Sequence, residues 1–149
     1  MGPVGTGKTH FIAALTRELL SKDKTAGFST VRALRRRVNA THADKSQESE
    51  EKIIRELSGV HVLALDDFGR EGSVTPESIG LLHEVLSARN DNRKLTLMTT
   101  NFSLQQVAEL YDPSISSRLS AWVPIVMGGA DRRKLVSQPI ERRSVGGIQ

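Results

Sequence analysis

This chain of 149 residues begins with a glycine-rich segment that sets strict requirements on the fold around it. Residues 2–9 read Gly-Pro-Val-Gly-Thr-Gly-Lys-Thr and match the pattern Gly-x-x-x-x-Gly-Lys-Thr at every fixed position. Glycines let the backbone curl around a phosphate with its N–H groups turned inward, and the helix that follows presents its positive end. The segment therefore predicts a phosphate loop for a nucleotide.

The loop also supplies side chains for the nucleotide and its metal ion. Lys8 would reach the β- and γ-phosphates as a point charge, and the hydroxyl of Thr9 would bind Mg²⁺. We expect the nucleotide to be held by the residues of the loop and the one after it: Gly2, Pro3, Val4, Gly5, Thr6, Gly7, Lys8, Thr9 and His10.

The rest of the chain alternates strand and helix patterns. We expect strands at residues 26–31, 60–65, 94–100 and 122–127, and helices at 9–21, 31–37, from Ser46 or Ser49 to 59, from 75 onward, 104–111 and 113–119. Such alternation predicts an open, mainly parallel α/β sheet. A phosphate loop normally follows a buried strand, and here only Met1 precedes it. We therefore expect a sheet that lacks its first strand.

Polar residues end two of the expected strands. Asp66 and Asp67 follow the apolar run 60–65, and Asn101 follows the strand at 94–100. Mg²⁺ prefers oxygen ligands, so Asp66 would hold the metal while Asp67 polarises the attacking water. Asn101 would hydrogen-bond the γ-phosphate or that water. Asp and Asn are also common in turns, but together with the phosphate loop they favour a catalytic site.

Composition excludes several classes of protein. The chain contains 0 cysteines, which excludes disulfide scaffolds, cysteine nucleophiles and thiolate metal sites. No apolar run approaches the roughly 18 residues that span a bilayer. We expect a soluble, cytoplasmic protein with no membrane partner. Its net charge of +4 is compatible with a nucleic-acid partner.

Four motifs together resemble a known family. They are the phosphate loop with His10, the run Leu-Asp-Asp-Phe-Gly-Arg-Glu at 65–71, Thr-Thr-Asn-Phe at 99–102 and Ile-Ser-Ser-Arg-Leu at 115–119. The chain resembles the AAA+ ATPases of the DnaC/IstB type, which are replicative helicase loaders and transposase-associated ATP-binding proteins. The resemblance implies a P-loop NTPase fold, a three-layer α/β sandwich of the AAA+ type with a mainly parallel central sheet.

The resemblance also assigns roles. Lys8 and Thr9 bind phosphate and Mg²⁺, Asp66 and Asp67 are the metal-associated and water-activating acids, and Asn101 is the first sensor. Arg118 matches the arginine finger, which in this family reaches the nucleotide of a neighbouring subunit, so self-association through the face that carries Arg118 is implied.

A second sensor at Arg132 or Arg133 is suggested by the turn at residues 128–133. The expected domain is 1–133, followed by a basic tail at 134–149. The family's N-terminal region, which binds the helicase or transposase, has no counterpart in the sequence.

Two basic groups could bind single-stranded DNA through its phosphates. Their members are Arg32, Arg35, Arg36 and Arg37, and, later in the chain, Arg132, Arg133, Lys134, Arg142 and Arg143. A solvated helix face explains the same charges equally well.

The leading hypothesis is an ATP-hydrolysing helicase loader in DNA replication. The alternatives are a transposase-associated ATPase, a small-molecule P-loop kinase, and a DNA-binding or adaptor protein that does not hydrolyse ATP.

Overall fold

The computed structural model describes residues 1–41, 48–69, 75–111 and 113–133. In this part of the chain, three strands alternate with helices in the order α1 (Lys8–Leu20), β1 (Ala26–Thr30), α2 (Val31–Thr41), α3 (Glu50–Gly59), β2 (Val62–Phe68), α4 (Pro76–Asp91), β3 (Leu95–Thr100), α5 (Leu104–Leu110) and α6 (Pro113–Ser120). The strands lie side by side in the order β1-β2-β3, and both neighbouring pairs are parallel. The predicted parallel α/β sheet is confirmed.

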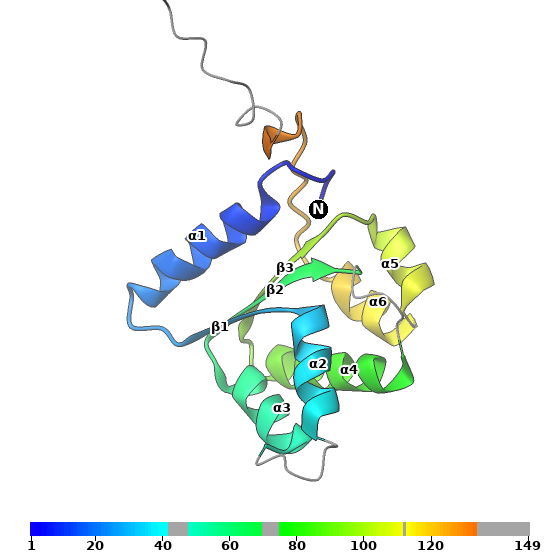
Figure 1. The fold of residues 1–149 in the computed structure, drawn as a ribbon. Helices are drawn as coiled ribbons and strands as arrows, with labels where there is room; N and C mark the ends of the chain where they lie inside the picture. The colour runs from blue at the N-terminus through cyan, green and yellow to red at the C-terminus, as the bar shows by residue number, and fades with distance from the viewer. Residues whose placement is uncertain (42–47, 70–74, 112, 134–149) are drawn as a thin grey trace, which may run out of the picture.

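Helices cover both faces of this sheet (Figure 1). Helix α1 lies on one face, and α2, α3 and α4 lie on the other. Alternation along β2 serves both layers, because successive side chains of a strand point to opposite faces. Leu63 and Leu65 pack into the main core with α2, α3 and α4, whereas Asp66 is hydrogen-bonded to Thr9 of α1. The predicted three-layer sandwich is therefore also confirmed.

Two helices begin at the residues that the sequence predicts. Ser49 caps α3 by accepting a hydrogen bond from the backbone N–H of Lys52. Thr75 caps α4, with Pro76 at the first helical position, and Ser78 completes a reciprocal capping box. A side-chain oxygen at this position satisfies one of the N–H groups that a helix start leaves unpaired. Ser46, the other predicted cap of α3, lies outside the described residues.

A fully buried arginine joins α4 to the start of the sheet. Arg89 is 0% exposed, and among the described residues no acidic side chain forms an ion pair with it. Its guanidinium donates instead to the backbone oxygens of Leu57, Val60, His61 and Leu95 and to Oγ1 of Thr96. The residue thus connects the end of α3 to the first residues of β2 and β3.

Two strand predictions need correction. The segment 122–127 is not a strand. Among the described residues, its backbone forms hydrogen bonds with Leu119 of α6 and with Met1. The amino group of Met1 donates to the oxygen of Ile125 at 2.7 Å, and the oxygen of Met1 accepts from the N–H of Met127 at 2.8 Å. A single residue such as Met1 is too short to form a β-ladder with this segment. The second correction concerns the strand predicted at 60–65. The structure has β2 at Val62–Phe68, because its pairing with β3 continues beyond Asp66 and Asp67.

The sheet is open on the side of β3. Within the described residues no strand precedes the phosphate loop, as the sequence predicts, and β3 pairs only with β2. A mainly apolar groove lies beside β3, with Met98, Leu104, Trp122 and Ile125 among the residues that line it. In Figure 1 the N-terminus lies next to the segment that leaves α6, which agrees with the hydrogen bonds of Met1. Across the described residues, no helix has both the length and the apolar character needed to cross a bilayer.

Candidate functional site

Glycines shape the loop that enters α1. Gly7 is the N-cap of α1 with φ +92°, and Gly5 has φ +79°. Both values lie in the left-handed region that residues with a Cβ seldom adopt. A Cβ at Gly5 would also lie 1.8 Å from Oδ1 of Asp131. Glycine is therefore required at position 5 both for the backbone turn and for the close approach of the chain that follows α6.

Lys8 is held inside the loop that it follows. Its Nζ donates to the backbone oxygens of Gly2 and Pro3 at 2.7 Å and 2.6 Å, and the side chain is buried. The hydroxyl of Thr6 donates to the same oxygen of Pro3 at 3.0 Å. Since the ammonium already lies at the centre of the curled loop, a phosphate there would gain a charge-assisted hydrogen bond.

The segment that follows α6 closes over the phosphate loop. The backbone N–H of Arg132 donates to the oxygen of Gly5 at 3.0 Å, and Oδ1 of Asp131 accepts from the N–H of Arg133 at 3.0 Å. Residues from opposite ends of the described chain therefore form one wall. The guanidinium groups of Arg132 and Arg133 stand on exposed side chains in that wall.

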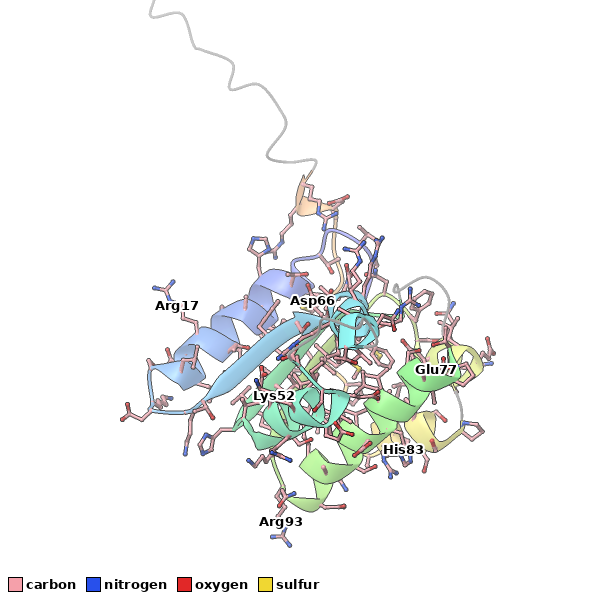
Figure 2. All side chains as sticks on the ribbon, turned by 60° about the horizontal axis from the view of Figure 1, so that its bottom comes forward. Arg17, Lys52, Asp66, Glu77, His83 and Arg93 are labelled. Carbon is pink, nitrogen blue, oxygen red and sulfur yellow. The ribbon has the colours of Figure 1, made fainter. Side chains whose placement is uncertain are left out.

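The two acids occupy different environments at the end of β2. Asp66 is 5% exposed, and its Oδ1 accepts hydrogen bonds from the hydroxyls of Thr9, at 3.1 Å, and of Thr99. Asp67 is exposed and has φ +56°, a left-handed value that Asp tolerates better than most residues. In Figure 2 Asp66 lies within the body of the molecule, whereas Arg17 and Arg93 extend from its rim.

These segments enclose one hollow at the carboxyl ends of the strands. The residues that line it come from the phosphate loop, the start of α1, the ends of β2 and β3 and the segment after α6: Val4, Gly5, Gly7, Lys8, Thr9, His10, Phe11, Asp67, Asn101, Met127, Arg132 and Arg133. Most of the residues predicted from the sequence for phosphate, water activation and sensing therefore meet in one place. Ligands of open α/β sheets bind in the crevice at this edge.

Other predicted site residues lie outside the lining of the hollow. Gly2, Pro3 and Thr6 form the inner hydrogen bonds of the loop, and Asp66 lies behind Thr9. Arg118 is on α6, where its Nε and Nη2 both donate to Oγ of Ser87 on α4, at 3.0 Å and 2.6 Å. It does not line the hollow of its own chain.

The structure adds residues that the sequence did not single out. Thr99 lies between the two acids, Asp131 lies against Gly5, and Phe11 and Met127 supply apolar surface to the hollow. One signal for Thr99 was present in the sequence. Strict alternation from Leu63 and Leu65 would put Asp67 on the core side and Phe68 on the opposite side. A strand that ends in Asp66-Asp67-Phe68 therefore needs a change of register to keep Phe68 in the core and Asp67 out of it. Thr99 lies opposite that change on β3.

The residues of the hollow fit a magnesium nucleotide. The hollow is lined by three cations that complement the charge of phosphates: Lys8, Arg132 and Arg133. Helix α1 begins at the hollow, so its positive N-terminal end would also face the phosphates. The hydroxyl of Thr9 and the carboxylate of Asp66 are 3.1 Å apart and are the oxygen ligands that Mg²⁺ prefers. Arg70 and Glu71 of the acidic motif and the predicted tail at 134–149 lie outside the described residues.

The chain is similar to known proteins over most of its length. The family model described as IstB-like ATP binding protein matches residues 1–119. The replicative helicase loader DnaC of Escherichia coli strain K12 is 29% identical over 126 residues, which make up 82% of this chain and 51% of DnaC. The crystal structure of DnaI has a TM-score of 0.72 at 29% identity and covers 89% of this chain and 70% of the DnaI chain.

A more distant structure shows the fold alone. AMPPCP-bound DnaA from Aquifex aeolicus has a TM-score of 0.77 at 17% identity, with 91% of this chain and 42% of the DnaA chain covered. The present chain spans about half the length of the curated relatives it matches. The family model covers well over half of the chain, from the phosphate loop to α6. The chain therefore belongs to the IstB-like ATP binding protein family, within the AAA+ ATPases of the DnaC/IstB type.

Proposed function

We propose that this chain binds ATP with Mg²⁺, hydrolyses it, and acts as a helicase loader in DNA replication. The observation that carries the proposal is the meeting of Lys8, Asp67 and Asn101 in one hollow. They come from the start of α1 and the ends of β2 and β3, so the fold itself brings them together. Membership of the family, whose description is ATP-binding, supports the nucleotide. Similarity to DnaC, a replicative helicase loader, supports the process.

In the proposed complex, the phosphates would be held by groups of the loop that form hydrogen bonds with one another in this structure. Lys8 would exchange the oxygens of Gly2 and Pro3 for the β- and γ-phosphates, and the N–H groups at the start of α1 would face the same oxygens. Thr9 and Asp66 would hold Mg²⁺, which when bound neutralises charge on the phosphates. Asp66 would offer the ion a carboxylate that the hydroxyls of Thr9 and Thr99 orient in this structure.

The exposed residues of the hollow would carry out hydrolysis. Asp67 would accept a proton from the attacking water, because its carboxylate faces the hollow rather than the core. Asn101, at the end of β3, would hydrogen-bond the γ-phosphate or that water. Arg132 and Arg133 line the opposite wall, and one of them would serve as the second sensor.

Arg118 would complete the site of a neighbouring subunit. Its guanidinium does not line its own hollow, and it projects from α6 onto Ser87. An arginine that stabilises charge on a transferring phosphoryl group can accelerate the reaction about 10³–10⁵-fold. We therefore propose self-association through the face that carries α6.

A second candidate is an ATPase that works with a transposase, because the matching family model is named IstB-like. Both candidates use the same nucleotide site and differ in the partner. Co-purification with a replicative helicase supports the helicase loader, and co-purification with a transposase in its place supports the alternative.

Single-stranded DNA is a further proposed partner, and two observations bear on the expected basic group. Arg32 and Arg36 are exposed on α2, whereas Arg37 forms ion pairs with Glu48 and Glu56. Backbone phosphates would bind such a surface in a salt-dependent way.

Nucleotide binding is tested with Lys8→Ala. We expect the affinity for a fluorescent ATP analogue to fall about 10- to 150-fold, because a hydrogen bond to a charged group is worth about 1.5–3 kcal/mol. Lys22→Ala is the matched control. Lys22 is an exposed lysine that lies just beyond the C-terminal end of α1, far along the helix from the phosphate loop, and pairs with Glu18. Equal affinities for Lys8→Ala and Lys22→Ala would overturn the proposal.

A further inference from the structure

The geometry points to Thr99 as a positioning residue that aims the carboxylate of Asp67 into the nucleotide hollow and fixes that of Asp66 behind it. This inference rests on the proposed roles of the two acids. Thr99 itself is 3% exposed and does not line the hollow. It would therefore act through its neighbours rather than on the nucleotide.

The first observation is a β-bulge. Leu65 pairs with Met98, and the next paired residues are Phe68 and Thr100. Two residues of β2, Asp66 and Asp67, therefore stand opposite the single residue Thr99. A bulge of this kind bends the strand and redirects a side chain, and such bulges are frequent beside active sites.

The bulge changes which face each later residue occupies. Phe68 joins Leu63 and Leu65 in the main core, where its ring stacks on Tyr111 with centroids 4.4 Å apart. If β2 kept strict alternation with the same sequence, Phe68 would turn away from this core and Asp67 would turn into it. The bulge thus keeps an ionised side chain out of an apolar layer and leaves it facing the hollow.

The second observation is the pair of hydrogen bonds at Thr99. Its Oγ1 accepts from the backbone N–H of Asp67 at 3.0 Å and donates to Oδ1 of Asp66. A hydroxyl has one donor and two acceptor sites, so one buried atom binds both acids at once. The N–H of Asp67 would otherwise face the edge of β3 where the ladder is interrupted.

The third observation is the backbone of Asp67 itself. Its φ of +56° is a left-handed conformation, which costs energy for a residue with a Cβ and persists where the surroundings hold it. The N–H of this residue donates to the hydroxyl of Thr99, which holds the backbone of Asp67 on the side of β3. Removal of the hydroxyl should therefore release Asp67 while the phosphate loop keeps its shape.

The test compares Thr99→Val with Thr100→Val in the full chain. Thr100 is the next residue of β3, is also buried, and has a hydroxyl that donates to the oxygen of Phe68 at 2.8 Å and accepts from the N–H of Phe102 at 3.1 Å. Both substitutions remove a buried bridging hydroxyl from the same strand. Of these two hydroxyls, that of Thr99 contacts the acids, whereas that of Thr100 contacts Phe68 and Phe102.

We expect Thr99→Val to lower kcat for ATP about 10- to 100-fold, the usual loss when a residue that orients a ligand is removed, with KM changed less than about threefold. Hydrogen exchange at the amide of Asp67, measured without nucleotide, should become faster in Thr99→Val. Thr99→Ser, which keeps the hydroxyl, should restore both values. Thr100→Val should change neither by more than about threefold.

The outcomes separate this inference from the proposed function. If Asp67→Asn hydrolyses ATP at the wild-type rate, the proposed role of Asp67 is wrong. If Asp67→Asn is impaired but Thr99→Val matches Thr100→Val in both kcat and amide exchange, Thr99 has no positioning role. If Thr99→Val does not fold, Thr99→Cys gives the same comparison, because a thiol is a weaker donor and acceptor than a hydroxyl.

Discussion

Arg89 has a structural role that its residue type does not suggest, because arginine side chains usually lie at the protein surface and this one is fully buried. Burial lowers the pKa of Arg89 to about 10, so the guanidinium remains charged at neutral pH and must be stabilised inside the protein. Backbone oxygens do this, including those of Leu57 at 2.7 Å and Leu95 at 2.5 Å. The buried charge is thus stabilised by backbone carbonyl groups and the hydroxyl of Thr96, and these acceptors in turn depend on the arginine for their hydrogen bonds.

We expect Arg89→Met to lower the free energy of unfolding by at least ~3 kcal/mol. Several backbone oxygens lose their donor at once, and each unsatisfied buried group costs about 1–3 kcal/mol. Urea unfolding followed by circular dichroism measures the change. Arg93→Met is the control, because Arg93 is an exposed arginine just beyond the same helix, where surface substitutions stay within about 0.5 kcal/mol. Similar values for the two variants would contradict this account of Arg89.

Sequence patterns indicate the proposed site residues better than the residues that support the structure around them. The phosphate loop, Asp67 and Asn101 meet in one hollow as expected, because a site for a phosphate and a metal ion requires particular residue types at fixed spacing. Arg89 sits in an amphipathic helix pattern where an arginine ordinarily faces solvent, and Thr99 reads as one more β-branched residue of a strand. Their importance depends on which groups of other elements lie opposite, and that information is not local in the sequence.

At the scale of elements, the starts of helices were predicted well. The end of α2 was not, since the helix predicted for 31–37 continues to Thr41, and strand ranges were predicted poorly. Capping residues such as Ser49 and Thr75 mark where helices begin, since the signal lies within the helix itself. A strand instead requires a neighbour. The run Val-Pro-Ile-Val at 123–126 has the composition of a strand, yet within the described parts of the chain its backbone pairs with the single residue Met1 and with no strand. The extension of β2 to Phe68 depends on β3 in the same way.

Helices α2 and α3 are joined by an ion pair whose contribution depends on pH. Hydrogen bonds from Arg37, one of them at 2.5 Å, lower the pKa of Glu56 below its ordinary value of 4.5. The folded state therefore favours the carboxylate. This stabilisation is fully present above the unfolded pKa and is lost as the pH falls through the folded pKa.

We expect Glu56→Gln to be less stable than wild type at pH 7 by about 0.2–1 kcal/mol, the range for pairs near the surface. Below the folded pKa the difference should vanish, because the wild-type carboxyl is then neutral as well. Chemical unfolding of both proteins across this pH range measures it. Glu18→Gln serves as the control, since Glu18 pairs with Lys22 just beyond the end of α1, joins no second helix, and is more exposed. A difference that persists in acid would exclude the ion pair as its cause.

For the whole molecule, the position of Arg118 predicts that hydrolysis requires two subunits. Arg118→Ala lacks the proposed finger, and Lys8→Ala lacks bound nucleotide, so each alone should be inactive. Mixed together they should recover part of the ATPase activity, because Lys8→Ala subunits carry an intact Arg118 to the loaded sites of their neighbours. Steady-state phosphate release at several mixing ratios measures the recovery.

The control mixture combines Lys8→Ala with Asp67→Asn. Neither variant then has a site that can both bind nucleotide and activate water, so mixing should restore nothing. Recovery in this control would show that the assay does not report on shared sites. Full activity of Arg118→Ala by itself, or no recovery with Lys8→Ala at any ratio, would refute a finger that acts between subunits.

The bulge at the end of β2 has a consequence for how this protein can change over time. It separates the sequence requirements of the core from those of the hollow, because Phe68 packs against Tyr111 while Asp67 lines the hollow. A side chain can therefore be exchanged at position 67 without repacking the interior. Deletion of one acid has a different effect. It would remove the bulge and restore strict alternation, so Phe68 would stay on the core side while only one acid remained where two now stand. Substitution at position 67 therefore changes the side chain that faces the hollow, whereas a deletion changes the register that places both acids.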